Sequence, residues 1–308
     1  MEVTSVTARR VTGEPLALAA MQSDLDFLGM ASGPVADSFT FTVEGHLARM
    51  DAMLYGGAAI AASMAAAEAV TGRSVVWSTT QFVATAGPGA QVVVAVEVLA
   101  QGRRASQVRV TGTDETGSVM FASLGATGAP DPDQPSGTFV SAPVVTDFER
   151  SPVWGGPIAT MARLLPQEVV LPAAPSGVGF TSVLELAEPE VLEHPDPGPG
   201  RMAFWVRRRD GGPMTPAVVA YVADLVPMAV SSALGVIEIG TSLDNTIRVD
   251  PSVETDRVLL DLRPHSSIGG CCDGVVHAWA ADGRLLATAS QTALLRPIDP
   301  AMFAAPAE

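Results

Sequence analysis

The sequence predicts an α+β fold in which one unit, a long helix followed by four antiparallel strands, occurs twice. Three observations support this prediction. The order of helix, strands and a tight hairpin turn recurs in the two halves, with Gly117 in one turn matching Gly283 in the other. The strand segments alternate apolar and polar residues. A chain of 308 residues, 47% of them hydrophobic, is also large enough to bury a sizeable core.

The first unit begins with a helix of small residues, which opens at the tetrapeptide Leu54–Gly57 and runs to about Val70. The segment 114–117, Asp-Glu-Thr-Gly, is typical of a hairpin turn between the last two strands. Four strands rich in Val and Thr are expected after the helix: Val75–Thr85, Gln91–Ala100, Ala105–Thr113 and Ser118–Ala126.

The second unit begins with a strand, Met202–Arg208, and then a helix. Thr215 is a favourable N-cap and Pro216 suits the first helical position, so the helix is expected to begin there and run past Asp224 to Leu234. Four further strands follow, the last two joined by a turn at 281–283: Val236–Val249, Arg257–Pro264, Gly274–Ala280 and Arg284–Leu295.

Two segments rich in Pro, Gly and acidic residues, 128–137 and 193–200, are expected to be exposed loops, since Pro removes a backbone donor. They divide the chain into an N-terminal unit at 1–137, a connecting region with the start of the second unit at 138–200, and a C-terminal unit at 201–308. The specialised site described below falls in the C-terminal unit.

Composition excludes several classes of function. All 18 basic residues are Arg, so Schiff-base chemistry and P-loop phosphate binding have no lysine to use. A net charge of −15 argues against nucleic-acid binding, which needs a concentrated basic face. Arg207, Arg208 and Arg209 form the one run of three cations, and they are expected to lie on a solvated strand edge.

No bound metal is expected, because the four His are scattered and the two cysteines, Cys271 and Cys272, are adjacent. Adjacent cysteines cannot link distant parts of the chain. No segment has the features of a signal peptide or a membrane span. The sequence therefore predicts a reduced, cytoplasmic protein.

Comparison of the two units indicates a specialised site in the second. Three polar residues there match apolar residues or glycine in the first unit at the offset of the hairpin glycines: Asp224 matches Ala58, Ser242 matches Val76 and Gln291 matches Gly125. An unpaired carboxylate within an apolar helix is costly to bury. A carboxylate, a hydroxyl and an amide together can hold one water by hydrogen bonds and accept its proton.

Five segments between about Phe39 and Arg296 carry a resemblance to a known family: Leu54–Gly57, Phe204–Arg207, Ala220–Leu225, Thr241–Thr246 and Asp282–Gln291. They resemble the double-hotdog acyl-CoA thioesterases of the thioesterase II type. A hotdog unit is a long helix wrapped by an antiparallel sheet. The resemblance therefore implies two tandem hotdog units, and pairing of their exposed edges is expected to join the two sheets into one surface.

In that family an Asp on the second helix, a Ser or Thr on the following strand and a Gln on the last strand position the hydrolytic water. The matching residues here are Asp224, Ser242 and Gln291. The resemblance thus implies hydrolysis of an acyl-CoA thioester to the free acid and coenzyme A. No cofactor is implied, because coenzyme A enters only as part of the substrate.

Substrate contacts are expected at the start of the first helix. Gly56 and Gly57 let a ligand approach the backbone closely, so their N–H groups are expected to polarise the thioester carbonyl, where the helix dipole favours developing negative charge. Ala58 is expected beside the acyl chain.

The chain also departs from the family. Where Asp-His-Ser is common, it has Asp244-Asn245-Thr246, and Asp244 and Asn245 are expected to support the strand structurally. Contact of Arg207–Arg209 with coenzyme phosphates is an alternative to a solvated edge.

Two alternatives to hydrolysis stay open. One is a non-catalytic acyl-thioester-binding hotdog protein. The other is an acyl-thioester hydratase or dehydratase, ranked lower because neither helix carries a His. A homodimer of double-hotdog chains and a role in fatty acid metabolism are further expectations.

Overall fold

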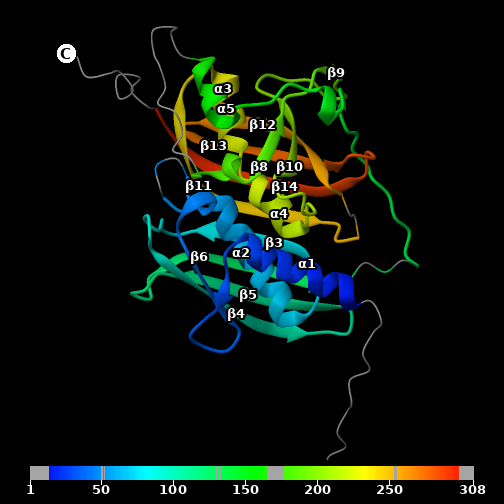
Figure 1. Cartoon of the computed structure of the whole chain (residues 1–308). Coiled ribbons are helices and arrows are strands. Elements are labelled where there is room, and N and C mark those ends of the chain that lie inside the picture. The colour runs from blue at the N-terminus through cyan, green and yellow to red at the C-terminus, as the bar shows by residue number, and fades with distance from the viewer. Residues whose placement is uncertain are drawn as a thin grey trace, which may run out of the picture.

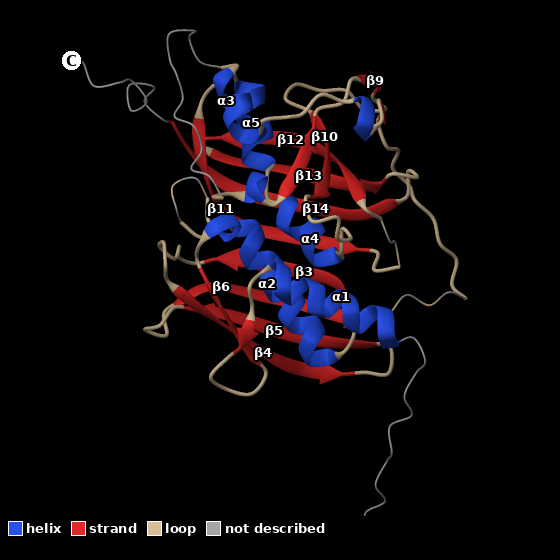
Figure 2. Ribbon diagram, viewed as in Figure 1, coloured by secondary structure: helices blue, strands red, loops and turns tan. Residues whose placement is uncertain are grey.

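One antiparallel sheet runs through the molecule in the computed structural model, which describes residues 14–49, 51, 53–129, 131, 133–164, 177–252 and 255–297. The N-terminal strands are β1 (Ala31–Ser32), β2 (Ser38–Thr42), β3 (Val75–Phe82), β4 (Gln91–Gln101), β5 (Ala105–Thr113) and β6 (Val119–Gly128). The C-terminal strands are β8 (Leu184–Ala187), β10 (Met202–Arg208), β11 (Glu238–Val249), β12 (Arg257–Ile268), β13 (Cys271–Ala280) and β14 (Leu285–Pro297). Their order within the described residues is β1-β2-β4-β5-β6-β3-β11-β14-β13-β12-β10-β8. The main helices lie on one side of this sheet (Figures 1 and 2).

The two units meet where β3 pairs with β11. Residues Trp77–Gln81 pair antiparallel with Asp244–Arg248, and Thr79 lies directly opposite Thr246 at the centre of this junction. The two threonine hydroxyls are hydrogen-bonded to each other. The predicted joining of the sheets edge to edge is therefore confirmed, and it removes two strand edges that would otherwise be open to other chains.

The first central helix, α2 (Gly56–Thr71), is buried along almost its whole length, from Gly57 to Glu68. Its alanine-rich surface lets it lie close to β3, β4, β5 and β6, which curve around it. Gly72 ends the helix with a left-handed φ of 64°, and its N–H donates to the Glu68 carbonyl. A further helix, α1 (Glu14–Phe27), packs on α2 and precedes the elements that the sequence predicted.

The second central helix is two helices, α4 (Pro216–Val222) and α5 (Val226–Leu234), so the prediction of one continuous helix is wrong. Its predicted start is confirmed, because the Thr215 Oγ1 accepts from the Val218 N–H at 3.2 Å. The break follows from Pro227, which has no N–H to donate to the Ala223 carbonyl and whose ring would clash with it. Asp224 lies in the break.

The number of residues that separates equivalent positions of the two units varies along the chain. The glycines that end the helices, Gly72 and Gly235, are 163 residues apart, whereas the hairpin glycines are 166 apart. Both junction strands carry a β-bulge, at Val76 in β3 and at Leu243 in β11.

Two of the three matches proposed from the sequence are therefore corrected. Ser242, which precedes its bulge, corresponds to Val75 rather than to Val76. Asp224 corresponds to Ala61 rather than to Ala58 when the helix ends are matched. The match of Gln291 with Gly125 is right, because these residues pair with equivalent positions of β11 and β3. A single offset failed because the bulges and the helix break shift the register.

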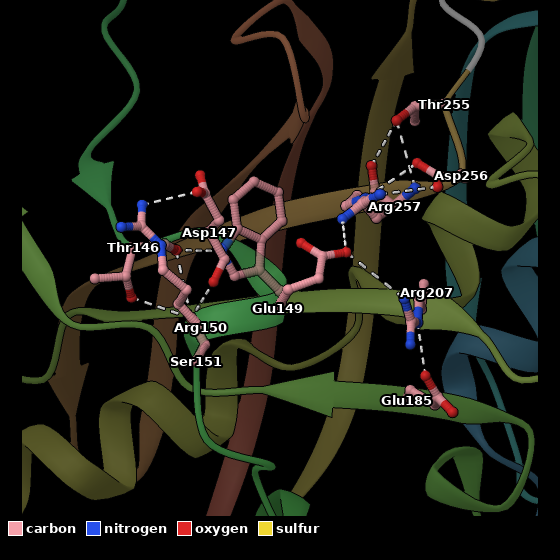
Figure 3. Close-up of polar contacts among 11 residues, drawn as sticks. Thr146, Asp147, Glu149, Arg150, Ser151, Glu185, Arg207, Thr255, Asp256 and Arg257 are labelled. Carbon is pink, nitrogen blue, oxygen red and sulfur yellow. Dashed lines mark hydrogen bonds and ion pairs between the residues drawn. The ribbon is translucent and has the colours of Figure 1, made fainter.

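The connecting region adds structure to the C-terminal unit. It contains the small strands β7 (Val144–Val145) and β9 (Val191–Glu193), the helix α3 (Gly156–Ala162) and the edge strand β8. Figure 3 shows how its segment 146–151 is fixed: Glu149 accepts from Arg257 and lies 3.9 Å from Arg207. The Trp205 Nε1–H donates to the Thr146 carbonyl at 2.9 Å.

The prediction that Arg207, Arg208 and Arg209 lie on a solvated strand edge is wrong for β10, which is paired on both sides, with β8 and β12. Arg207 Nε donates to Glu185 at 2.6 Å. Arg208 is 6% exposed and bonds Asp210, while Arg209 bonds the Thr181 carbonyl. All three guanidinium groups thus have partners within the protein.

Taken together as one segment, Pro216–Leu234 is long and apolar enough to cross a membrane, and 72% of its most apolar window is buried inside the fold. It is divided at Ala223–Leu225; its first part, α4, packs against α2, and its second part, α5, packs against the sheet. Its apolar character is therefore that of core helices in this fold.

Candidate active site

Asp224 is a carboxylate buried at the centre of the molecule. It lies in the break between α4 and α5 and is 7% exposed. Because Pro227 interrupts the helix at this point, the Asp224 side chain can point toward the sheet and toward the start of α2. The break between the two helices thus positions the Asp224 carboxylate.

Gln291 connects this carboxylate to the sheet. It lies on β14, is 2% exposed, and its Nε2 donates to the Asp224 Oδ1 at 2.6 Å and to the Ser242 Oγ at 2.9 Å. Its Oε1 accepts from the Val226 N–H at 2.9 Å. Since a backbone N–H can only donate, this last bond fixes which end of the amide faces Asp224.

Ser242 completes the group from β11. Its Oγ lies 3.5 Å from the Asp224 Oδ1. Side chains three apart on a regular strand point to opposite faces, but the bulge at Leu243 lets Ser242 and Asn245 both face the helices. The structure therefore brings Asp224, Ser242 and Gln291 together within hydrogen-bond distance.

Gly56 and Gly57 provide space for other parts of the protein. A Cβ at Gly56 would overlap the Asp224 Oδ2, and a Cβ at Gly57 would overlap the Tyr221 carbonyl oxygen of α4. The first glycine admits the carboxylate and the second admits the neighbouring helix. This close approach puts Asp224 beside the N-terminus of α2.

Burial raises the pKa of Asp224 from 3.8 to about 7. Several groups oppose this rise by favouring the ionised form: the side chains of Asn245 and Ser242, the charge of Arg49 and the N–H of Gly57. A carboxyl group that titrates near neutrality can accept a proton from a bound water at physiological pH.

A cavity of about 280 Å³ lies next to this group. Its residues come from both units, with the larger part from the first: Arg49, Leu54, Gly56, Ala59, Phe82, Val83, Ala84, Thr85, Met120, Phe121, Thr241 and Ser242. Ala58 does not line it and instead packs with Leu28, Phe41, Leu47 and Ala62. Its neighbour Ala59 takes the position beside the cavity.

Two residues near Asp224 were not singled out for the site from the sequence. Arg49 lines the cavity, donates to Asp51 from Nε at 3.0 Å and to the Gly240 carbonyl at 3.4 Å, and nothing in its sequence context marks it. Asn245 is 1% exposed and faces Asp224, although the sequence suggested a structural role. Its position opposite Gln291 depends on the strand register.

Comparison with known proteins shows the family to which the two units belong. A model of the acyl-CoA thioesterase N-terminal domain matches residues 45–127, and one of the acyl-CoA thioesterase C-terminal domain matches residues 163–295. No curated protein matches the chain. A solved structure from Novosphingobium aromaticivorans, assigned as a thioesterase, is 30% identical, with 86% of this chain and 98% of that chain covered and a TM-score of 0.73.

Two more distant structures share the fold. A hot-dog-fold protein of unknown function from Alicyclobacillus acidocaldarius is 17% identical, with 90% of this chain and 99% of that one covered and a TM-score of 0.71. An acyl-CoA thioesterase II from Mycobacterium marinum is 16% identical over 90% and 99% of the two chains, with a TM-score of 0.61.

Proposed function

Because the chain belongs to the acyl-CoA thioesterase family, we propose that it hydrolyses an acyl-CoA thioester with a water molecule that Asp224 deprotonates. The observation that carries this proposal is the hydrogen-bonded group of Asp224, Gln291 and Ser242 next to a cavity. Gln291 and Ser242 both bond one oxygen of the carboxylate, Oδ1, and we assign the other oxygen, Oδ2, to the water.

In the proposed reaction the Asp224 carboxylate takes a proton from the water, and the water oxygen attacks the thioester carbonyl carbon. The carbonyl electron pair moves to oxygen in the tetrahedral intermediate. When the intermediate collapses, the C–S bond breaks, and the coenzyme A thiolate leaves and takes the proton that Asp224 holds. General base catalysis of this kind contributes roughly 10²- to 10⁴-fold.

The developing oxyanion would be stabilised at the N-terminus of α2. Gly56 lines the cavity, so its N–H is the donor that we assign to the thioester carbonyl. The N–H of Gly57 faces Asp224 and lowers the pKa of that carboxyl group. The two glycines would then serve the oxyanion and the base, respectively.

The lining of the cavity suggests an acyl group without charge. Its walls include Phe82, Met120 and Phe121, which favour a hydrocarbon. Arg49 is the one charged residue among the lining residues. One cation does not balance the several phosphate charges of coenzyme A, so the coenzyme would stay outside the cavity and only the acyl group would enter it.

The cellular setting belongs to the same proposal. Of the two cysteines, Cys271 is exposed and Cys272 is buried, and both are free, which suits a reducing cytoplasm. Fatty acid metabolism would supply the substrates. A homodimer is a further part of the proposal, and its test is the molar mass in solution.

The experiment that tests the function is thiol release from a series of acyl-CoA substrates, from acetyl-CoA to palmitoyl-CoA. Wild type should release free thiol, and Asp224→Asn should lower kcat by roughly 10²- to 10⁴-fold while still binding a non-hydrolysable thioether analogue. Thiol release at equal rates from both proteins would exclude Asp224 as the base. No release from any acyl-CoA, with the analogue still bound, would indicate a binding protein.

A further inference from the structure

Asn245 has a buried side chain that the proposed reaction does not use. It lies on β11 and is 1% exposed. Neither its Oδ1 nor its Nδ2 has a hydrogen-bond partner within the described part of the chain. A buried amide without partners lowers stability, so its presence here calls for an explanation in terms of function.

The residues on either side of Asn245 are already bonded to others. Gln291, directly opposite on β14, bonds Asp224 and Ser242 with its amide N–H groups and Val226 with its amide oxygen. Thr80, directly opposite on β3, bonds the Ser123 hydroxyl at 2.8 Å. Neither neighbour within the sheet therefore uses the Asn245 amide.

The remaining neighbour is Asp224, which approaches from the helix layer. The bulge at Leu243 turns Asn245 to the same face as Ser242, toward this carboxylate. Among the groups that hold down the pKa of Asp224, the Asn245 side chain has the largest effect. Arg49 and the Tyr55 phenol, from the segment before α2, also face Asp224.

We propose that Asn245 is a positioning residue that acts through Asp224, donating a hydrogen bond from its amide to the ionised carboxylate. The inference rests on the proposed function, because it assumes that Asp224 acts as the base. It adds a third side chain that holds this base, beside Gln291 and Ser242. With the amide in place, the carboxylate is held both in its ionised form and in its orientation toward the cavity.

A matched pair of variants tests the proposal. Asn245→Val and Asn245→Thr have nearly the same shape and both suit a strand, but Thr keeps a hydroxyl donor. We expect Val to lower kcat by roughly 10- to 100-fold, the usual effect of a lost hydrogen bond to a charged group, and Thr to recover part of that loss. Affinity for the thioether analogue should be the same in all three proteins.

Thermal stability separates this role from a merely structural one. Below pH 7, where Asp224 is protonated and the proposed hydrogen bond to its ionised form is absent, the Val variant removes only a buried amide without a partner, so its Tm there should be equal to or above that of wild type. Ser78 occupies the position equivalent to Asn245 in β3, so Ser78→Ala is the matched control and should leave kcat unchanged. A structural role for Asn245 would instead lower Tm and leave kcat intact in the folded fraction.

The pH dependence of kcat/KM is a second test of the proposal. In Asn245→Val the acidic limb of kcat/KM should move to higher pH, because the ionised form of Asp224 loses a donor. If the Val and Thr variants have the same kcat and the same pH profile, the proposal is wrong, whatever the Tm values of the two variants. A wild-type protein that releases no thiol would instead overturn the proposed function, and the role of Asn245 with it.

Discussion

The Gln291 Nε2 donates a hydrogen bond of 2.6 Å to the Asp224 Oδ1 and so connects strand β14 to the break between helices α4 and α5. The same amide accepts from the Val226 N–H at the start of α5. One side chain therefore bonds both the acid and the backbone next to it. This arrangement fixes the position of Asp224 relative to the cavity.

Gln291→Ala should lower kcat by about 10- to 100-fold, because it removes a hydrogen bond to a charged group and leaves the proton acceptor in place. The loss should be smaller than that of Asp224→Asn. Steady-state thiol release measures it. Thr292→Ala is the control, since Thr292 is the next residue of β14 and points to the other face of the sheet. A Gln291 variant as inactive as Asp224→Asn would contradict this ranking.

Gly56→Ala should lower kcat by roughly 10²-fold, since the new Cβ would overlap the Asp224 Oδ2 and displace the carboxylate. The Phe82 ring, 3.3 Å away, limits the room on the other side. Gly87→Ala is the control, because a Cβ there meets no atom within 4 Å. Turnover of Gly56→Ala at the wild-type rate would exclude a tight fit between this glycine and the acid.

Gly57→Ala should act mainly on stability, because alanine keeps the backbone N–H that faces Asp224. Its Cβ would overlap the Tyr221 carbonyl oxygen, which is backbone and cannot rotate away. Overpacking of this kind costs about 1–3 kcal/mol, so Tm should fall more than in Gly56→Ala. Thermal denaturation of the two variants side by side tests the difference. A higher Tm for Gly57→Ala than for Gly56→Ala would be inconsistent with the helix contact.

The pH dependence of kcat/KM follows from the raised pKa of Asp224, about 7. The base must be ionised, so kcat/KM should rise about tenfold per pH unit below that pKa and level off above it. Rates measured between pH 5 and 9 test this. Residual activity of Asp224→Asn should lack this limb. A wild-type profile that is flat across pH 6 to 8 would show that another group, or Asp224 with a lower pKa, limits the reaction.

Local patterns in the sequence were enough to predict the repeated unit. Hairpin turns with glycines at positive φ, Gly117 and Gly283, and runs of alternating residues depend on short-range chemistry. The helix break was missed even though Pro227 is visible in the sequence, since the pattern around it stays apolar on both sides. Short strands such as β8, which has four residues, were missed because they are too short to show a clear run of alternating residues.

The three polar residues of the site could be found by comparing the two halves, although the register was wrong for two of them. The inference survived because Ala58 and Ala61, like Val75 and Val76, are apolar. Asn245 could not be placed in the site in this way. Its closeness to Asp224 depends on a bulge and on pairing across two strands, which a single sequence does not reveal.

Three buried acids should make the folded protein less stable as the pH rises. Burial raises the pKa of Glu68 to about 8 and those of Asp24 and Asp224 to about 7, from ordinary values of 4.5 and 3.8. Between the ordinary and the raised pKa the folded state binds more protons than the unfolded state. This contribution to stability is thus complete below about pH 4 and is lost as the pH rises through 7 to 8. Tm should therefore fall between pH 5.5 and 8.5.

The variant Glu68→Gln tests the contribution of one of these acids, because its amide oxygen can still accept from the Val75 N–H. Over the same pH range its unfolding free energy should fall less than that of wild type, by an amount on the order of a few kcal/mol. Calorimetry of both proteins at several pH values measures the difference, and parallel curves would mean that Glu68 is ionised in the folded protein.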